Sequence, residues 1–270
     1  MFKKRKLVSP FEIKGMGVHS GSEIKVKVEK GEREGIVFYN QRRKCKLSPE
    51  LDYVKNFSST FLIKGNCEIR TIEHFMSAVY ILGFDSIRFS ISGDEFPILD
   101  GSAKEIVESL LVHSEIMGEI DDFFLVEKDG IVRDKDSFIR YSPSDEFLVD
   151  YTIVYNHPSI GKMSFSVAIS EETFINEISP ARTFGFLKDA EYLKSKGYAL
   201  GANFENTVVF DSEKLLNPPL RFENEMVRHK ILDFIGDLSF LRKPVRGYFK
   251  VYKGGHSLHI KLVKELLNIS

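Results

Sequence analysis

The sequence has little of several features that would point to particular classes of protein. Only two cysteines, Cys45 and Cys67, occur among 270 residues. They are too few for a disulfide framework or a four-thiolate zinc site, so we expect them to be reduced in a cytoplasmic protein. The 38 Lys and Arg nearly balance the 39 Asp and Glu, for a net charge of −1, so no basic field indicates a nucleic-acid partner. The longest nearly uncharged apolar run, residues 75–84, is about half the length of a transmembrane helix, and we expect no transmembrane segment.

Three familiar motifs are also missing. Residues 15–21 (GMGVHSG) are rich in glycine but match neither GxGxxG nor GK[ST], so we reject a dinucleotide or nucleotide-triphosphatase site and predict a turn between strands. The HExxH peptidase signature is absent, so any metalloenzyme here must take its ligands from distant segments. Residues 2–6 (FKKRK) precede no apolar signal core, although they leave weak membrane contact open.

What is present is an ordinary globular composition, with 43% hydrophobic and 29% charged residues, in a chain long enough for one large domain or two. Apolar alternation or β-rich composition predicts strands at residues 23–30, 86–92, 147–155, 162–170 and 248–253. Helical spacing predicts helices at residues 71–82, 102–112, 223–240 and 257–267. A capping box, Ser102-x-x-Glu105, is predicted to open the second helix.

The two halves repeat one order of elements. A helix–strand–helix series at residues 71–112 recurs at residues 223–267, and the acidic stretch 118–122 is the natural boundary between them. Because the residue match is weak, the pattern leaves an internal duplication and coincidence equally open.

The helix at residues 223–240 carries the most informative pattern. His229, Asp233 and Asp237 follow each other at i, i+4 and i+8, on the side opposite an apolar stripe that starts at Val227. One line of an imidazole and two carboxylates can supply two metal ligands and a supporting group. The alternative is a solvated face with a His–Asp pair.

Two further segments add to this pattern. Glu73 and His74 lie just inside an otherwise apolar helix, so His74 can ligate a metal while Glu73 addresses what the metal binds; the alternative is an exposed first turn. Two histidines and one carboxylate form the ligand set of catalytic zinc, with a spare carboxylate as base. His256 follows Gly254 and Gly255, which would place it at a loop tip, although this segment by itself favours an ordinary strand–helix turn with an exposed histidine.

Taken together, these segments resemble the UDP-3-O-acyl-N-acetylglucosamine deacetylases, the zinc hydrolases of bacterial lipid A (lipopolysaccharide) biosynthesis. The resemblance spans nearly the whole chain. It rests on residues 17–21 (GVHSG), 71–74 (TIEH), 97–103 (PILDGSA), 156–158 (NHP), 181–186 (ARTFGF), 220–223 (LRFE), 227–238 (VRHKILDFIGDL) and 255–258 (GHSL).

The resemblance implies an α+β fold of two similar domains, each a β-sheet packed on helices, with a small insert in each half and the active site between them. The domains would be residues 1–120, with Glu73 and His74, and residues 121–270, with His229, Asp233 and His256. We expect a cytoplasmic monomer.

The resemblance also assigns roles to single residues. One Zn²⁺ would be held by His74, His229 and Asp233, although ferrous iron suits the same ligands. A zinc-bound water would attack the amide of the UDP-linked substrate and release acetate. The other roles would be general base for Glu73, general acid for His256, orientation of that histidine for Asp237, oxyanion stabilisation for Thr183, and substrate contacts for Lys230 and Phe184.

Three departures from the family pattern leave detail open. His259 stands where Asn is usual and would alter the loop or offer an extra ligand, residues 58–60 (SST) replace a CTT-like stretch, and residues 203–207 (NFENT) replace SLDNA. Two other functions also stay open: hydrolysis of another amide or ester, and a non-catalytic binding protein that kept the fold. For the enzyme, we expect a bell-shaped pH profile with limbs from Glu73 and His256.

Overall fold

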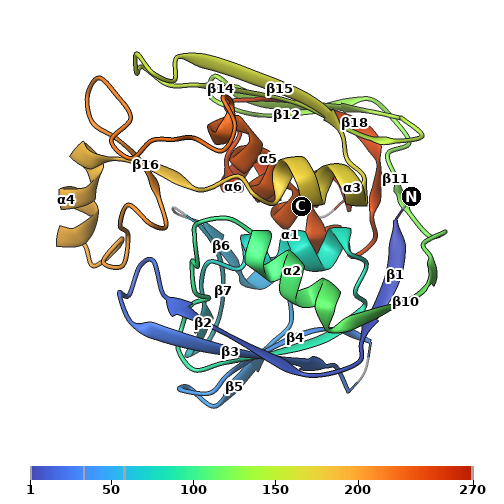
Figure 1. Ribbon diagram of the computed structural model, residues 1–270. Coiled ribbons are helices and arrows are strands. Elements are labelled where there is room, and N and C mark those ends of the chain that lie inside the picture. The colour runs from blue at the N-terminus through green and yellow to red at the C-terminus, as the bar shows by residue number, and fades with distance from the viewer. Residues whose placement is uncertain (1, 33, 57–58, 269–270) are drawn as a thin grey trace.

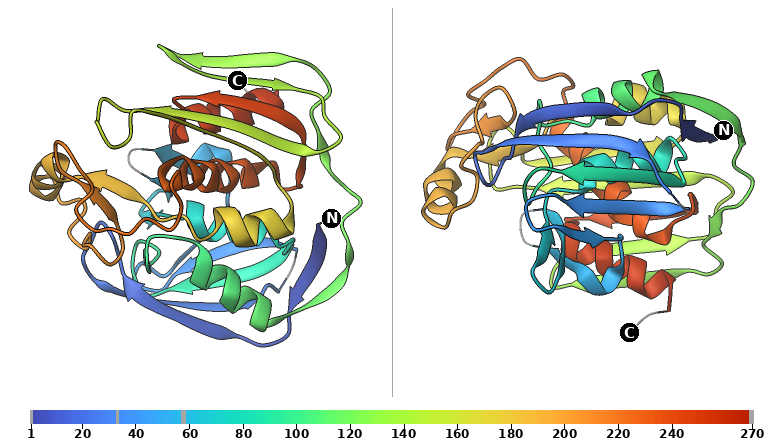
Figure 2. Two further views of the ribbon diagram at one scale, coloured as in Figure 1. Left: turned by 45° about the horizontal axis from the view of Figure 1, so that its top comes forward. Right: turned by 90° about the horizontal axis from the view of Figure 1, so that it is seen from below.

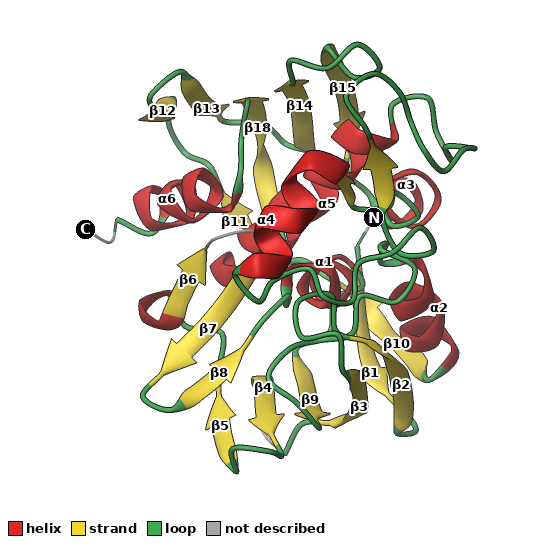
Figure 3. Cartoon of the chain, turned by 90° about the vertical axis from the view of Figure 1, so that its left-hand side faces the viewer, coloured by secondary structure: helices red, strands yellow, loops and turns green. Residues whose placement is uncertain are grey.

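The computed structural model describes residues 2–32, 34–56 and 59–268. The fold is α+β, with helices between two outer β-sheets (Figures 1 and 3). The first sheet has the order β2 (Phe11–Met16), β3 (Glu23–Lys30), β9 (Ser86–Ile91), β4 (Gly35–Asn40) and β5 (Cys45–Leu47). The second has the order β12 (Gly130–Asp134), β13 (Ser137–Ser142), β18 (Val245–Tyr252), β14 (Phe147–Val154) and β15 (Lys162–Ala168), and β11 (Phe124–Leu125) pairs with β18.

The two sheets share one topology. In the first, β9 is antiparallel to β3 and parallel to β4; in the second, β18 is antiparallel to β13 and parallel to β14. The outer pairs β2–β3, β4–β5, β12–β13 and β14–β15 are all antiparallel. This match in strand order and direction favours the duplication that the sequence pattern left open. The division at residue 120 stays a prediction.

Four helices fill the space between the sheets: α1 (Glu73–Ile81), α2 (Lys104–Val112), α5 (Glu225–Leu238) and α6 (His256–Leu266). Every residue of α1 is buried, and so is every residue of α5 except Arg228 and Lys230. A β-carbon added to Gly236 would lie 2.2 Å from the carbonyl oxygen of Glu73, so only glycine allows α5 to approach α1 this closely. The polar residues of both helices are therefore forced into the interior together.

Each half carries an insert. In the first half it follows η1 (Leu51–Tyr53) and is a three-stranded sheet of β6 (Val54–Asn56), β7 (Thr60–Lys64) and β8 (Cys67–Ile69). In the second half it contains the parallel pair β16 (Phe184–Phe186) and β17 (Val208–Phe210), with α4 (Leu187–Ser195) between them in sequence. This second insert projects beyond the layers in both views of Figure 2. The remaining elements are β1 (Lys3–Leu7), β10 (Ser114–Glu119), α3 (Glu171–Thr173), η2 (Phe174–Ile178) and η3 (Ser239–Leu241).

The predicted strands and helices agree with the structure to within a few residues at their ends, and residues 17–21 do form a turn between β2, which includes residues 15 and 16, and β3. One local prediction is wrong. The helix α2 begins at Lys104 with Ala103 as its N-cap, and the Ser102 hydroxyl instead donates to Asp100 and accepts from the Lys104 backbone N–H and from Arg221. The Ser102 side chain therefore makes these contacts and does not form a capping box with Glu105.

The expectation of reduced cysteines is also wrong for this structure, in which Cys45 and Cys67 form a disulfide. Strands β5 and β8 bring the two Cα atoms within 5.9 Å, inside the range that a disulfide spans. The sequence spacing of 22 residues gave no sign of this contact, because it depends on how the first insert folds back. A cytoplasmic location stays a prediction.

The basic N-terminal segment is neutralised by acidic partners. Strand β1 pairs with β10, and its four basic side chains, Lys3, Lys4, Arg5 and Lys6, bond to Glu119, Asp85, Glu171 and Glu115 respectively. This arrangement leaves little free positive charge for the membrane contact considered above. Across the described part of the chain, none of the helices combines the length and apolar character needed to cross a bilayer.

Candidate active site

The centre of the site is a set of three side chains from two helices. His74 comes from the first turn of α1, and His229 and Asp233 come from successive turns of α5. Asp233 Oδ1 lies 3.7 Å from His74 Nε2 and 3.4 Å from His229 Nε2. Tetrahedral zinc bonds of about 2.0–2.1 Å separate neighbouring ligand atoms by roughly 3.4 Å. The three atoms are therefore spaced as metal ligands.

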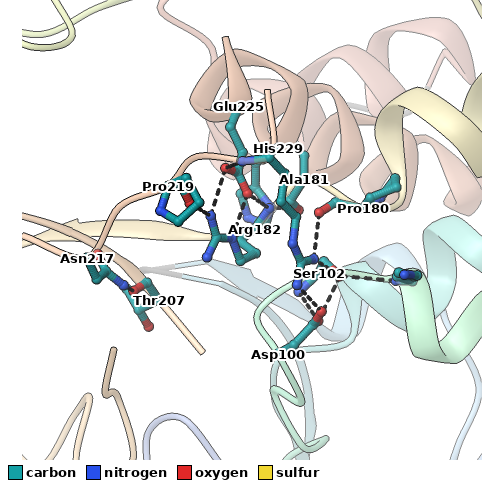
Figure 4. Close-up of polar contacts among 12 residues, drawn as sticks. Asp100, Ser102, Pro180, Ala181, Arg182, Thr207, Asn217, Pro219, Glu225 and His229 are labelled. Carbon is teal, nitrogen blue, oxygen red and sulfur yellow. Dashed lines mark hydrogen bonds and ion pairs between the residues drawn. The ribbon is translucent and has the colours of Figure 1, made fainter. Parts of the chain in front are cut away.

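Both histidines are in the state that a metal requires. Burial lowers the pKa of His74 to about 3 and also lowers the pKa of His229, so both rings are neutral. His229 Nδ1 lies 3.0 Å from the carbonyl oxygen of Ala181 (Figure 4). Because that oxygen is an acceptor, Nδ1 carries the proton. The lone pair of Nε2 then faces Asp233 Oδ1 in the cluster. A carbonyl that fixes the tautomer in this way is a frequent partner of metal-binding histidines.

Asp233 stays ionised despite being buried. Burial alone would raise its pKa, but the charges of Lys230 and His256 hold that pKa well below its usual range. Lys230 donates to Oδ2 at 2.8 Å, while Oδ1 faces the two imidazoles. The carboxylate therefore has one oxygen anchored and the other directed at the cluster.

Glu73 and His256 lie beside this set. Glu73 is 4% exposed, and its Oε2 accepts the backbone N–H of Thr60 at 3.1 Å. Burial raises the pKa of Glu73 to about 8. His256 Nε2 is 4.0 Å from Asp233 Oδ2. Glu73, Asp233 and His256 have ligand atoms within 4.8 Å of one another. Without a cation Glu73 therefore holds a proton near neutral pH, and the charge of a metal ion at the cluster would lower its pKa and leave it able to accept one.

His256 is held by Asp237. Its Nδ1 lies 2.8 Å from Asp237 Oδ2, and Thr60 Oγ1 donates to Asp237 Oδ1 at 2.5 Å. Burial opposes a charge here, but Asp237 raises the pKa of His256 to about 9, so the ring is cationic near neutral pH. The three alternatives with exposed groups are wrong, because the first turn of α1 with Glu73 and His74 is buried, His256 is the buried first residue of α6, and the line from His229 to Asp237 faces the interior.

Among the described residues, three sets of side chains have ligand atoms within 4.8 Å of one another: His74–His229–Asp233, Glu73–Asp233–His256 and Asp237–His256–His259. The last two are poorer cation sites, because His256 is cationic and because Asp237 already accepts both imidazole Nδ1 groups. The first set offers two neutral imidazoles and one anion. The residues present therefore fit a divalent cation best at His74, His229 and Asp233.

Thr183 and Phe184 belong to the segment that supports His229. The segment follows Ala181, and Lys230 Nζ lies 5.8 Å from the centre of the Phe184 ring. Thr183 is half-buried, and its backbone N–H donates to Gly101. Both residues therefore follow closely after Ala181, which contacts His229, and Phe184 also lies beside Lys230.

A buried ion pair fixes this segment to α5. Arg182 donates to Glu225 through its backbone N–H and its side chain, and also to Pro219, as Figure 4 shows. Glu225 is fully buried and also accepts the backbone N–H of Arg221. The side chain of Arg221 in turn reaches Asp100 at 2.8 Å. These contacts hold the segment that carries the Ala181 carbonyl against α5.

Sequence reasoning missed several supporting groups. Thr60 was noted only as a departure, yet it contacts both Glu73 and Asp237. A backbone carbonyl such as that of Ala181 leaves no signal in a sequence. Of the other two residues in the replaced stretch, Ser59 Oγ lies 3.4 Å from His19 Nε2, and Ser58 lies outside the described residues.

Comparison with known proteins decides the family. A model of the family described as "UDP-3-O-acyl N-acetylglycosamine deacetylase" matches residues 4–268. The chain belongs to this deacetylase family. The resemblance found in the sequence is therefore confirmed.

Curated relatives agree with this deacetylase assignment. A protein named UDP-3-O-acyl-N-acetylglucosamine deacetylase from Nautilia profundicola is 39% identical, over 98% of this chain and 92% of the relative. Proteins of the same name from Campylobacter fetus and Thermodesulfovibrio yellowstonii are 42% and 36% identical. They cover 94% and 98% of this chain, and 88% and 91% of the relatives.

Proposed function

We propose that this deacetylase-family protein hydrolyses the N-acetyl group of a UDP-linked 3-O-acyl-N-acetylglucosamine in lipid A biosynthesis. The observation that carries the proposal is the buried set of His74, His229 and Asp233, with Glu73 and His256 next to it, in a chain of this family. The products are acetate and the free amine. We also propose that the enzyme acts as a cytoplasmic monomer, with the site between domains 1–120 and 121–270.

The metal in this proposal is zinc, held by His74, His229 and Asp233. When bound, zinc supplies a positive charge that lowers the pKa of a water molecule to roughly 7 and polarises a carbonyl. Ferrous iron suits the same ligands, and metal analysis of the purified protein distinguishes the two.

The remaining chemistry belongs to side chains of this protein. Amide hydrolysis needs a proton removed from the attacking water and a proton delivered to the leaving nitrogen. Glu73, anchored by the Thr60 N–H, takes the first, and the cationic His256, paired with Asp237, gives the second. Each proton transfer accelerates the reaction on the order of 10²–10⁴-fold. The C–N bond breaks, the acyl carbon gains the water oxygen, and the nitrogen leaves as a neutral amine.

Three more residues act on the substrate. The Thr183 hydroxyl donates to the carbonyl oxygen as that oxygen becomes negative, a contact typically worth about 3 kcal/mol. Lys230 and Phe184 bind the sugar diphosphate and the adjoining sugar or acyl chain, because together they offer a cation beside an aromatic face.

Lys230 gives the test of the UDP-linked substrate. Because Lys230 also holds Asp233, charge reversal would disturb a proposed metal ligand as well as substrate binding. We therefore choose Lys230→Met. The KM for the UDP-linked substrate should rise about tenfold or more, since a hydrogen bond to a charged group contributes about 1.5–3 kcal/mol. The KM for the same acylated sugar without UDP should change little.

The control is Lys250→Met, which removes an exposed lysine from β18. Metal content is measured for both variants, so that a lost ligand is not mistaken for lost substrate binding. An unchanged KM for the UDP-linked substrate would favour hydrolysis of another amide or ester. Binding of the UDP-sugar with no acetate released by zinc-loaded wild-type protein would favour the non-catalytic alternative.

A further inference from the structure

His259 contacts Asp237, the carboxylate that holds the general acid His256, although the proposed mechanism gives His259 no role. It lies one turn after His256 on α6 and is fully buried. His259 Nδ1 is 2.8 Å from Asp237 Oδ2, the same oxygen that contacts His256 Nδ1 at 2.8 Å. One carboxylate oxygen therefore links two imidazoles of the same helix to α5.

The other nitrogen of His259 is also engaged. Its Nε2 lies 3.0 Å from the hydroxyl of Tyr151, a fully buried residue of β14. Burial raises the pKa of Tyr151 well above its ordinary value, so the hydroxyl keeps its proton and donates to Nε2. Burial also lowers the pKa of His259, which keeps the ring neutral. The ring must then carry its single proton on Nδ1 and donate it to Asp237.

These contacts exclude the role of extra metal ligand that the sequence left open. Nδ1 faces Asp237 and Nε2 faces Tyr151, so neither nitrogen has a lone pair directed at the set of His74, His229 and Asp233. The position of His259 instead affects Asp237. With Thr60 on Oδ1 and two imidazoles on Oδ2, the orientation of this carboxylate is fixed by three donors from outside α5.

We propose that His259 is a positioning residue, which, with its ring held by Tyr151, fixes the Asp237 carboxylate and through it the ring of His256. The inference rests on the proposed function, because it concerns the group that delivers the proton to the leaving amine. Supporting residues of this kind typically change activity 10–100-fold when removed. A family-typical Asn at position 259 could place its amide donor near that of His Nδ1, but an Asn lacks a second ring nitrogen for Tyr151.

The kinetic test compares three substitutions in the zinc-loaded protein. His259→Leu removes both contacts and fills the space with an apolar side chain. Its kcat should fall about tenfold, with KM within about twofold of the wild-type value. His259→Asn restores a donor to Asp237 and should recover most of that loss. Tyr151→Phe removes only the hydroxyl, and its kcat should lie between those of the two His259 variants. His113→Leu, a matched control from outside the site, should leave kcat unchanged.

A second readout does not depend on activity. In protein labelled with ¹⁵N at histidine, the His259 resonances should show a protonated Nδ1 and an unprotonated Nε2. Tyr151→Phe should keep Nδ1–H, because the Asp237 carboxylate still accepts it, and should shift the Nε2 resonance, because that nitrogen loses its hydrogen-bond donor. This variant keeps the imidazole in place, so the test survives even if His259→Leu fails to fold.

The outcomes separate this inference from the proposed function. No acetate from zinc-loaded wild-type protein would refute the proposed function itself. An active wild type whose His259→Leu variant folds and keeps full kcat would overturn the positioning role alone. So would a His259 ring that carries its proton on Nε2, or a His259→Asn variant as impaired as His259→Leu.

Discussion

The His229→Ala variant is expected to bind much less than one metal ion per chain and to lose acetate release by a factor on the order of 10³ or more. His229 supplies one of only three protein ligands in the proposed set, and its Nε2 is 3.4 Å from Asp233 Oδ1. Metal acting as a Lewis acid contributes several kcal/mol to the transition state, and each 1.36 kcal/mol is a factor of ten. Metal analysis and acetate release are measured on the same sample.

His113→Ala is the matched control, because it removes a histidine whose ring stacks on Phe11, away from the cluster. This control should keep both metal and activity. The thermal midpoint of each metal-free variant shows whether the fold is intact. A His229→Ala variant that holds a full equivalent of metal at wild-type affinity would contradict the ligand assignment.

The Glu73→Gln variant should show the second-largest loss, a decrease in kcat of about 10²–10⁴-fold with the metal retained. Glutamine has the shape of the glutamate and can still accept the Thr60 N–H, but it cannot take a proton from water. Because burial raises the pKa of Glu73, a neutral side chain carries no added desolvation cost there. The variant should therefore keep the wild-type thermal midpoint while KM changes little.

The comparison for this variant is Glu172→Gln, which makes the same substitution at an exposed position of α3 away from the site. It should leave kcat unchanged. Full activity in Glu73→Gln would mean that another group removes the proton from water. Loss of metal together with kcat would instead assign Glu73 to the metal site.

Local sequence was enough to predict the elements with the clearest signals, five strands and four helices, because those signals come from periodic or β-rich patterns. The alternation of Ile24, Val26 and Val28 predicts a strand at residues 23–30, where β3 lies. The i, i+4, i+8 spacing of His229, Asp233 and Asp237 places all three on one side of α5. Whether that side faced water or the interior depended on α1, which packs against α5 through the close contact at Gly236. A single helix contains no information about that contact.

The supporting contacts of the site depend on segments that meet only after folding. Thr60 is 177 residues from Asp237 in sequence, and Tyr151 is 108 residues from His259. The Cys45–Cys67 pair depends on the same kind of information, since β5 belongs to the main sheet and β8 to the insert. His259 was the exception with a visible signal. It stood out as a departure from the family pattern, but its i, i+3 spacing from His256 puts both rings on one face only because α6 begins at His256, one residue before the predicted helix.

The most direct test of the central claim is a zinc titration of metal-free wild-type protein, with acetate release from UDP-3-O-acyl-N-acetylglucosamine measured at each step. The account predicts no release without metal, a rise in proportion to zinc up to about one ion per chain, and loss of activity on chelation. Full acetate release by metal-free protein would contradict it, as would stoichiometric zinc binding with no acetate released.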